Sequence, residues 1–355
     1  MRNALLGVWC MVCGITSGNA QDRGTVSVLV FADYFYNLQR DTALTNAVLG
    51  GEEGYNAFQF RRIYLTYDHQ LSKEFATRVR LEADEAALTS DGKIGLFIKD
   101  AYVTWKRMFG RQDLVFGIQP TPAFEVSERF WGYRSLEKTI MDLRGIVGSR
   151  DFGISLRGPI DAGGNIDYVV LVANGSGIRP EGDTGKRLYA RVGAKPTDEM
   201  EITLYGDYSA QPDIVSAYSG GNVANSVVTG GAFIGLALAE KMRIGIEGVF
   251  QSTMNGYDTG TELLSRNKMG ISVFARWAAS ETVEIIGRYD LFDPNVHTNA
   301  TKDRRGYVVG GMSWSPSPNV AVIPNILIET FERTAQRSIK ASMTGRLTVV
   351  WSVSE

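Results

Sequence analysis

The sequence predicts an all-β protein: a transmembrane antiparallel β-barrel of about 16 strands with one long inward-folded loop. Three observations carry this prediction. Short segments along the whole chain alternate apolar and polar residues with the period of two that is typical of β-strands. The links between these segments are alternately short and long. After residue 20, no apolar run is long enough to cross a bilayer as a helix.

The first 20 residues are predicted to be a cleavable secretory signal, so that the barrel domain comprises residues 21–355. An apolar run follows Arg2 and ends in small residues before the predicted cleavage point. Both cysteines of the chain, Cys10 and Cys13, lie inside this signal. The mature chain is therefore expected to contain no disulfide and no thiolate metal site.

The numbers of basic and acidic residues indicate which partners the protein can attract. The chain has 37 Lys and Arg residues against 39 Asp and Glu residues. This near balance gives no global attraction for nucleic acid, which is not expected as a partner. No motif indicates a cofactor, and none is expected.

The alternation is clear in residues 75–84. Odd positions there include Phe75 and Val79, whereas even positions include Arg78 and Glu82, so one face suits lipid and the other suits water. The same split recurs in residues 151–158, 187–194, 268–278 and 338–352. A soluble β-sandwich alternates in the same way, so alternation alone leaves both folds open.

The connections separate the two folds. Strand patterns lie near 25–36, 57–70, 74–86, 95–106, 113–119, 151–158, 165–174, 186–194, 200–209, 226–239, 242–251, 268–278, 282–292, 305–315, 320–332 and 338–353. Links after even-numbered strands are short, whereas those after odd-numbered strands are mostly long, at 37–56, 119–150, 174–186, 210–225, 252–267 and 293–304. An even strand number with short turns at one end and long loops at the other is typical of an outer-membrane barrel. The last strand is expected to pair with the first, because lipid leaves an open sheet edge unsatisfied.

Four tryptophans provide a second indication of a membrane barrel. Trp105, Trp277, Trp314 and Trp351 all lie near the ends of even-numbered strands, before a short turn or the end of the chain. Tryptophan favours the membrane–water boundary because its ring is apolar and its N–H needs a polar partner. We expect the four to form one girdle at the periplasmic level; the alternative is a set of unrelated core tryptophans.

The face opposite the lipid should line the lumen of the barrel. Nine arginines lie on that face: Arg62, Arg78, Arg80, Arg157, Arg191, Arg243, Arg276, Arg288 and Arg346. Guanidinium groups in a narrow channel raise the local anion concentration and offer planar donor forks to oxyanions. The same face carries acidic residues such as Glu82 and Asp100. A mutually neutralised wall is therefore the alternative to an anion preference.

The longest interval between two strand patterns, residues 119–150, mixes apolar residues with many charges and is not linker-like. Three segments in and around it are GIQPTPAFE (117–125), YRSLEKTIMDL (133–143) and SRDFG (149–153). They resemble the phosphate-selective porin O and P family of bacterial outer membranes. Two further segments are similar to that family, YVVLVANGSG (168–177) and RYDLFDPN (288–295).

The resemblance implies that this interval folds into a sixteen-stranded barrel as a constriction loop, that anions such as phosphate pass, and that the chain forms a homotrimer. Five cations of the loop are the candidates for the narrowest point: Arg129, Arg134, Lys138, Arg144 and Arg150. Acidic neighbours such as Glu128 and Asp142 leave two alternatives open, since they could cancel these charges or pair with them to fasten the loop to the wall.

The function predicted from these observations is a porin of the bacterial outer membrane that passes small hydrophilic solutes passively, with a preference for anions or phosphate. Its partners are expected to be membrane lipid and the solutes. The alternative is a barrel with a closed lumen that acts through its outer loops, in adhesion or as a receptor surface. An outer-membrane enzyme is not expected, because no serine is placed beside a histidine on the outer face and the mature chain has no cysteine.

Overall fold

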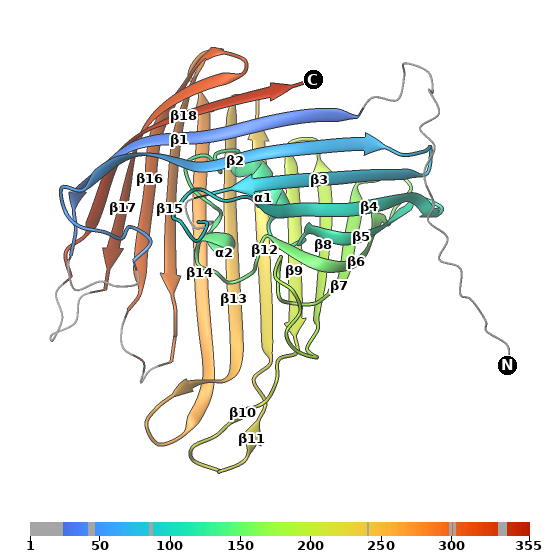
Figure 1. The fold of residues 1–355 in the computed structure, drawn as a ribbon, viewed down its shortest axis with the longest axis vertical. Coiled ribbons are helices and arrows are strands. Elements are labelled where there is room, and N and C mark those ends of the chain that lie inside the picture. The colour runs from blue at the N-terminus through green and yellow to red at the C-terminus, as the bar shows by residue number, and fades with distance from the viewer. Residues whose placement is uncertain are drawn as a thin grey trace, which may run out of the picture.

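The computed structural model describes residues 24–41, 47–84, 88–239, 241–297, 300, 303–332 and 339–355. Within this part of the chain, sixteen strands form one closed antiparallel barrel and two short strands form a separate hairpin (Figure 1). The predicted fold class is confirmed. The predicted signal, residues 1–20, lies outside the described residues.

Most strand bounds agree closely with the predicted segments. In chain order the strands are β1 (Thr25–Gln39), β2 (Asn56–Gln70), β3 (Phe75–Ala83), β4 (Phe97–Phe109), β5 (Gln112–Pro120), β6 (Arg150–Pro159), β7 (Ile166–Ala173), β8 (Arg187–Thr197), β9 (Met200–Ser209), β10 (Ile214–Val215), β11 (Asn222–Val223), β12 (Val227–Leu238), β13 (Met242–Asp258), β14 (Leu263–Ala278), β15 (Val283–Asp293), β16 (Arg305–Ser317), β17 (Val320–Phe331) and β18 (Ser342–Ser354). Strands that follow one another pair with one another, and β9 pairs directly with β12 because β10 and β11 form the separate hairpin.

The barrel closes between its first and last strands. β1 pairs antiparallel with β18 along almost its whole length, from Ser27 opposite Ser354 to Gln39 opposite Met343. The terminal residue takes part, since Val26 and Glu355 exchange two backbone hydrogen bonds of 3.0 Å. Closure leaves no strand edge to be solvated, which is the condition for a sheet that spans lipid.

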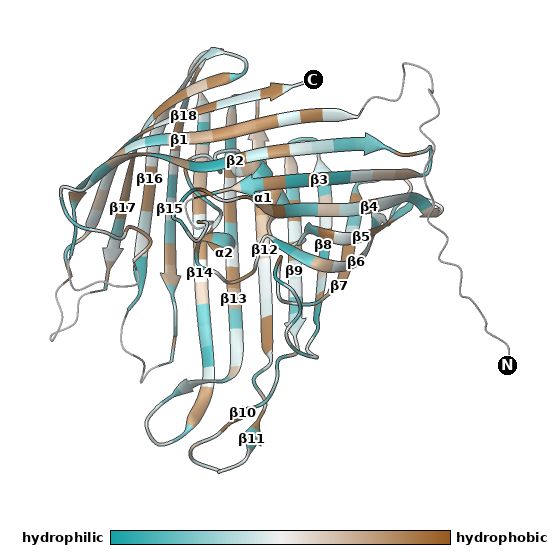
Figure 2. Ribbon diagram, in the orientation of Figure 1, coloured by the Kyte–Doolittle hydropathy of each residue, from teal (hydrophilic) through white to brown (hydrophobic). Residues whose placement is uncertain are grey.

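The outward face of the wall is apolar. On β14, Ile271 and Val273 are exposed on the outer face, whereas the alternate residues Ser272 and Phe274 are buried inside the barrel. Figure 2 shows apolar and polar residues alternating along many of the strands. A closed barrel with an apolar outer face lies in the bacterial outer membrane.

The connections are unequal at the two ends of the barrel. Those at one end are tight turns, such as residues 110–111 between β4 and β5 and residues 160–165 between β6 and β7. In the latter turn, Asp161 accepts N–H groups of Ile166 (2.7 Å) and Asn165 (3.2 Å), and these bonds lower the pKa of its carboxyl. Most of the long connections lie at the other end, where the β10–β11 hairpin projects beyond the wall (Figure 1).

One predicted loop is wrong. Residues 252–267 were expected to be a long loop, but β13 and β14 extend through most of that segment, and residues 259–262 alone connect them. The two strands stay paired out to Asp258 opposite Leu263 after an irregularity beyond Thr253. The polar residues in this stretch therefore belong to a β-hairpin that continues past the membrane zone, where both faces meet water.

The four predicted girdle tryptophans lie opposite the first residues of strands that start at one rim. The register pairs are Trp105 with Phe75, Trp277 with Met242, Trp314 with Val283, and Trp351 with Val320. These partners are the first residues of β3, β13, β15 and β17, which all follow tight turns. The register thus puts the four at the rim of the short turns; their role as a membrane girdle stays a prediction.

Two short helices, α1 (Glu125–Trp131) and α2 (Ile140–Leu143), lie in the segment between β5 and β6. No helix among the described residues is long and apolar enough to cross a membrane.

Candidate functional site

The segment of residues 121–149, which we call the inward loop, lies inside the barrel (Figure 1). Helix α1 contacts β12, β13 and β14, and α2 contacts β14. α1 ends at Trp131 and is capped by Gly132, whose φ of 69° is the left-handed conformation that glycine adopts without strain. The chain turns at Gly132 and continues to α2.

Arginines of the wall hold the backbone of the inward loop. The carbonyl of Leu136 accepts hydrogen bonds from Arg61 of β2 (2.9 Å) and Arg346 of β18 (2.6 Å). The carbonyl of Lys138 accepts one from Arg288 of β15. Since these donors come from three separate strands, the loop is fixed from several directions at once.

Acidic residues of the wall add side-chain contacts. The hydroxyl of Ser127 donates to Glu247 of β13 at 3.0 Å, and Arg129 pairs with Glu201 of β9 at 2.5 Å. Arg144 pairs with Glu329 of β17 at 2.9 Å, and both side chains are almost wholly buried. Some charged residues of the loop therefore form ion pairs that fasten the loop to the wall, which is one of the two alternatives stated for them.

The inward loop also packs as an apolar core against one part of the wall. Trp131 is fully buried, and its ring lies 5.4 Å from that of Phe274 on β14. Phe130 contacts Phe233 of β12 at a ring distance of 5.4 Å. The same cluster reaches β15, β16 and β17, and it includes Leu49 of the β1–β2 connection. The expectation that the inner face is generally polar is thus wrong for this part of the wall, because the loop shields it from water.

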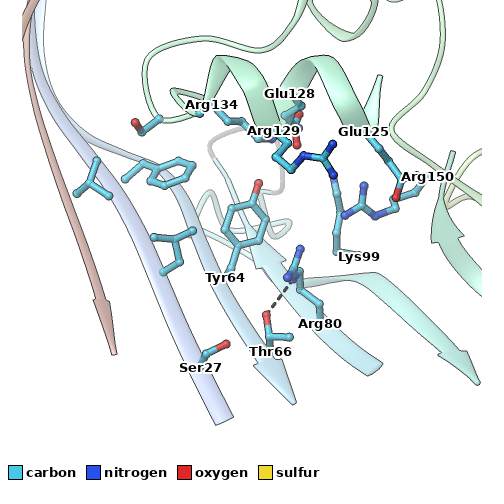
Figure 3. A pocket seen from close by; sticks show the side chains of 15 residues that line it. Ser27, Tyr64, Thr66, Arg80, Lys99, Glu125, Glu128, Arg129, Arg134 and Arg150 are labelled. Carbon is cyan, nitrogen blue, oxygen red and sulfur yellow. Dashed lines mark hydrogen bonds and ion pairs between the residues drawn. The ribbon is translucent and has the colours of Figure 1, made fainter. Parts of the chain in front are cut away.

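Open space also lies on the opposite side of the loop. A cavity of about 490 Å³ separates the inward loop from the strands β1 to β4 (Figure 3). Five cations line it: Arg80, Lys99, Arg129, Arg134 and Arg150. Among the described lining residues, the only acidic ones are Glu125 and Glu128. We call this space the cationic passage.

The acidic partners of the wall cations are hidden from the passage. Asp100 pairs with Arg80 (3.4 Å) and with Arg150, and Glu82 pairs with Lys99 (2.9 Å). Both carboxylates have 0% of their side-chain surface exposed. A solute in the passage therefore meets the cations first, although the nearby charges of both signs almost balance.

Two β-bulges bring extra charged residues into the lumen. Arg61 on β2 has no register partner on β1, and Lys99 on β4 has none on β3. A bulge lets two consecutive side chains point to the same face. Hence Arg61 and Arg62 both make inward contacts, to Asp33 (2.5 Å) and to Glu82, and Lys99 accompanies its neighbour Asp100.

Sequence reasoning missed Arg61 and Lys99, because strict alternation assigns them to the lipid face. A signal was present, since two adjacent charged residues interrupt each strand. In a regular strand one of each pair would face lipid, at a cost of roughly 2 to 4 kcal/mol near the midplane for a basic residue. A bulge at each position was therefore predictable.

The structure divides the five predicted loop cations. Arg129, Arg134 and Arg150 line the passage. Arg134 is held between Glu128 and Asp142, the second at 2.9 Å. Lys138 and Arg144 do not line it, and Arg144 is buried against Glu329.

The nine predicted lumen arginines differ in the groups that they contact. Arg80 lines the passage and donates to Thr66 at 2.8 Å. Arg62 does not line the passage and pairs with Glu82. Arg276, Arg288 and Arg346 contact backbone carbonyls of the inward loop. Arg78, Arg157 and Arg191 bond to Asp68 (2.7 Å), Gln119 (2.9 Å) and Asp167 (2.7 Å). Arg243 lines a second cavity of about 280 Å³ together with Arg276.

A metal centre is not indicated. Among the described residues, no group of three His, Cys, Asp or Glu side chains is placed to hold a metal ion. The cationic passage instead offers fixed positive groups. Fixed charges of this kind attract ions of the opposite sign.

The closed sixteen-stranded barrel, its apolar outer face and its inward loop define an outer-membrane β-barrel with a segment folded into its lumen. No family model matches the chain, and no curated protein matches it in sequence. Solved structures of similar fold include the outer membrane channel DcaP of Acinetobacter baumannii, with 11% identity over 95% of this chain and 99% of that chain and a TM-score of 0.66. An anion-selective porin from Comamonas acidovorans has 10% identity over 94% of this chain and 100% of that chain, with a TM-score of 0.64. OmpF of Salmonella typhi, in complex with daunomycin, has 10% identity over 92% of this chain and 97% of that chain, with a TM-score of 0.63.

At such identities the likeness shows the fold. It supports the architecture of porins in general and not the narrower phosphate-selective family that the loop segments resemble.

Proposed function

We propose that this protein is a passive diffusion channel of the outer membrane for small hydrophilic solutes, and that it prefers anions. The observation that carries the proposal is the cationic passage. Five basic side chains line it, while the carboxylates of Glu82 and Asp100 that hold three of them are fully buried. The solute therefore approaches guanidinium and ammonium groups more closely than it approaches any wall carboxylate.

The physical argument rests on distance. The attraction between unit charges falls with separation and is strengthened where little water screens it. In the passage Arg129 is the most accessible cation, with 57% of its side chain exposed, and it reaches in from the loop side. Lys99 and Arg80 face it from the wall (Figure 3). An anion that enters contacts donors from both sides.

Phosphate is one anion that the resemblance of the loop segments suggests will pass, and planar guanidinium groups suit phosphate oxygens. One of the solved structures of similar fold is titled an anion-selective porin. The same resemblance supports a homotrimer. No step of the proposal requires catalysis, and we propose a transport role without enzymatic activity.

Single-channel recording of the purified mature protein in planar bilayers tests the proposal. In a KCl gradient, the reversal potential should show chloride passing more readily than potassium, and added phosphate should reduce the chloride current. Arg129→Gln should lower the chloride preference about fivefold, since one unit charge at about 4 Å contributes on the order of 1 kcal/mol in water. Lys138→Gln changes the same charge in the same loop outside the passage and is the matched control. Equal effects of the two variants, or no ion preference in the wild type, contradict the proposal.

A second candidate function uses the outer loops. The β10–β11 hairpin projects beside the long β13–β14 hairpin, where Tyr218 bonds to Asp258, and Val215 is well exposed. A surface of this kind suits contact with another macromolecule. A folded barrel that gives no conductance steps would favour this alternative over the channel.

A further inference from the structure

The cationic passage has a second side that is apolar. Leu29 and Phe31 of β1, Tyr64 of β2 and Val350 of β18 line it. Leu29 lies directly opposite Tyr64 in the register, and Phe31 lies directly opposite Val350. The rings of Phe31 and Tyr64 meet edge to face at 5.9 Å. Four side chains on three adjacent strands thus form one continuous surface, which we call the apolar side of the passage.

This surface is separate from the apolar cores that hold the inward loop. Leu29, Phe31 and Tyr64 belong to neither core cluster as far as the described residues show, and Val350 packs only at the margin of one. Phe31 and Tyr64 are nearly buried, whereas Leu29 and Val350 are partly exposed. The rings therefore support the surface, and Leu29 and Val350 present it to the passage.

The apolar and cationic sides meet at Arg80. Its guanidinium lies 5.5 Å from the centre of the Tyr64 ring, and its Nε donates to Thr66 at 2.8 Å. Figure 3 shows Tyr64 beside this pair, with Lys99, Arg129 and Arg150 on the further side. A solute in the passage thus touches fixed cations on one side and hydrocarbon on the other.

We propose that the preferred solutes are small organic anions with a compact apolar body, such as aromatic carboxylates, rather than inorganic phosphate. The inference rests on the proposed anion channel and names its substrate class. Inorganic phosphate is hydrated on all sides and gains nothing from Leu29 or Val350, whereas a phenyl ring loses unfavourable water contact there. A volume of about 490 Å³ admits a solute of that size.

The test compares anions of equal charge on the purified mature protein in planar bilayers. Benzoate and acetate carry the same carboxylate, so a purely electrostatic passage treats them alike. Benzoate should half-block the chloride current at about a tenfold lower concentration than acetate, because it alone has a ring to bury. Inorganic phosphate should block less strongly than benzoate. Equal block by benzoate and acetate, or stronger block by phosphate than by benzoate, overturns the inference.

Two neighbouring valines provide matched variants. Val350 lines the passage, whereas Val349 lines a groove on the outer face of the barrel. Val350→Thr keeps the shape and removes apolar surface, so it should weaken block by benzoate several-fold and leave block by acetate unchanged. Val349→Thr should change neither. Leu29→Thr is a second inward variant that should act as Val350→Thr does, and an unchanged benzoate block in both inward variants contradicts the assignment of the surface.

The reversal potential of the same channels separates this inference from the function on which it rests. Channels without any anion preference contradict the proposed function. Channels that prefer anions but do not discriminate benzoate from acetate contradict only the substrate class.

Discussion

The Nζ of Lys99 lies 2.9 Å from the Oε2 of Glu82, and the carboxylate is fully buried while the ammonium lines the passage. Glu82 also pairs with Arg62. Its two partners thus come from β2 and β4, the strands with the bulges, on either side of β3. One buried carboxylate holds cations of both neighbouring strands in place without itself facing the solute.

Replacement of Lys99 should reduce ion selectivity. Lys99→Met keeps the length of the side chain and removes its charge, so the chloride-to-potassium permeability ratio should fall about fivefold, which corresponds to about 1 kcal/mol. The reversal potential in a salt gradient measures the change. Lys93→Met removes a highly exposed lysine of the β3–β4 connection and should leave the ratio unchanged. An equal shift in both variants would mean that the total charge of the mouth, rather than the passage, sets selectivity.

Breaking the pair between Arg144 and Glu329 should loosen the inward loop. Both side chains are almost wholly buried, and Glu329 also accepts the backbone N–H of Leu49 at 3.2 Å. Arg144→Ala leaves a carboxylate buried without its charged partner, which costs roughly 3 to 5 kcal/mol. We expect a lower denaturant midpoint and noisier open-channel current.

The control for this prediction is an exposed pair. Arg304 contacts Glu332 at 3.4 Å, and half of the arginine side chain is exposed. Arg304→Ala should change the free energy of unfolding by at most about 1 kcal/mol. Quiet, wild-type current from Arg144→Ala would show that the loop is held without this pair.

The barrel and its strand count follow from the sequence, because alternation and loop asymmetry are dictated by lipid on one side and water on the other. The entry of residues 119–150 into the lumen does not follow from these patterns and was expected only from the resemblance of the loop segments to a porin family. The bulges do not follow from alternation, since each depends on a local shift of register at Arg61 or Lys99. The bulges are indicated only by the adjacent charged residues, since one of each pair would otherwise face lipid at a high free-energy cost.

The apolar part of the inner wall was also missed. On β12 both faces carry apolar residues, for example Phe233 inside and Ile234 outside. A strand that is apolar on both faces is typically buried on both, so this pattern indicated that something packs inside the barrel there. Which loop cations reach the passage depends on the path of the inward loop, and no sequence period encodes that path.

Two glycines of β12 should respond differently to a methyl group. A Cβ at Gly235 would lie 2.5 Å from the ring of Phe130 on α1, whereas a Cβ at Gly230 would have no neighbour within 4 Å. Gly235→Ala should therefore destabilise the protein by roughly 1 to 3 kcal/mol through overpacking. Gly230→Ala should be neutral or slightly stabilising. Denaturant unfolding followed by tryptophan fluorescence compares them, and equal stabilities would show that α1 does not press on this part of the wall.

The depth of the membrane can be read from two positions on the outer face of β13. Met242 is the register partner of Trp277 at the rim of the short turns. Ile246 lies four residues further along β13 on the same face, with 45% of its surface exposed. Four residues along a tilted strand correspond to about 10 Å of depth. Ile246→Arg should thus cost roughly 2 to 4 kcal/mol and Met242→Arg about 0 to 1 kcal/mol, because the penalty for arginine falls towards the interface. Reversible unfolding into denaturant from lipid vesicles measures both values. A larger penalty at Met242 than at Ile246 would move the membrane boundary away from the four tryptophans, and equal small penalties at both would mean that this face of β13 is not in contact with lipid.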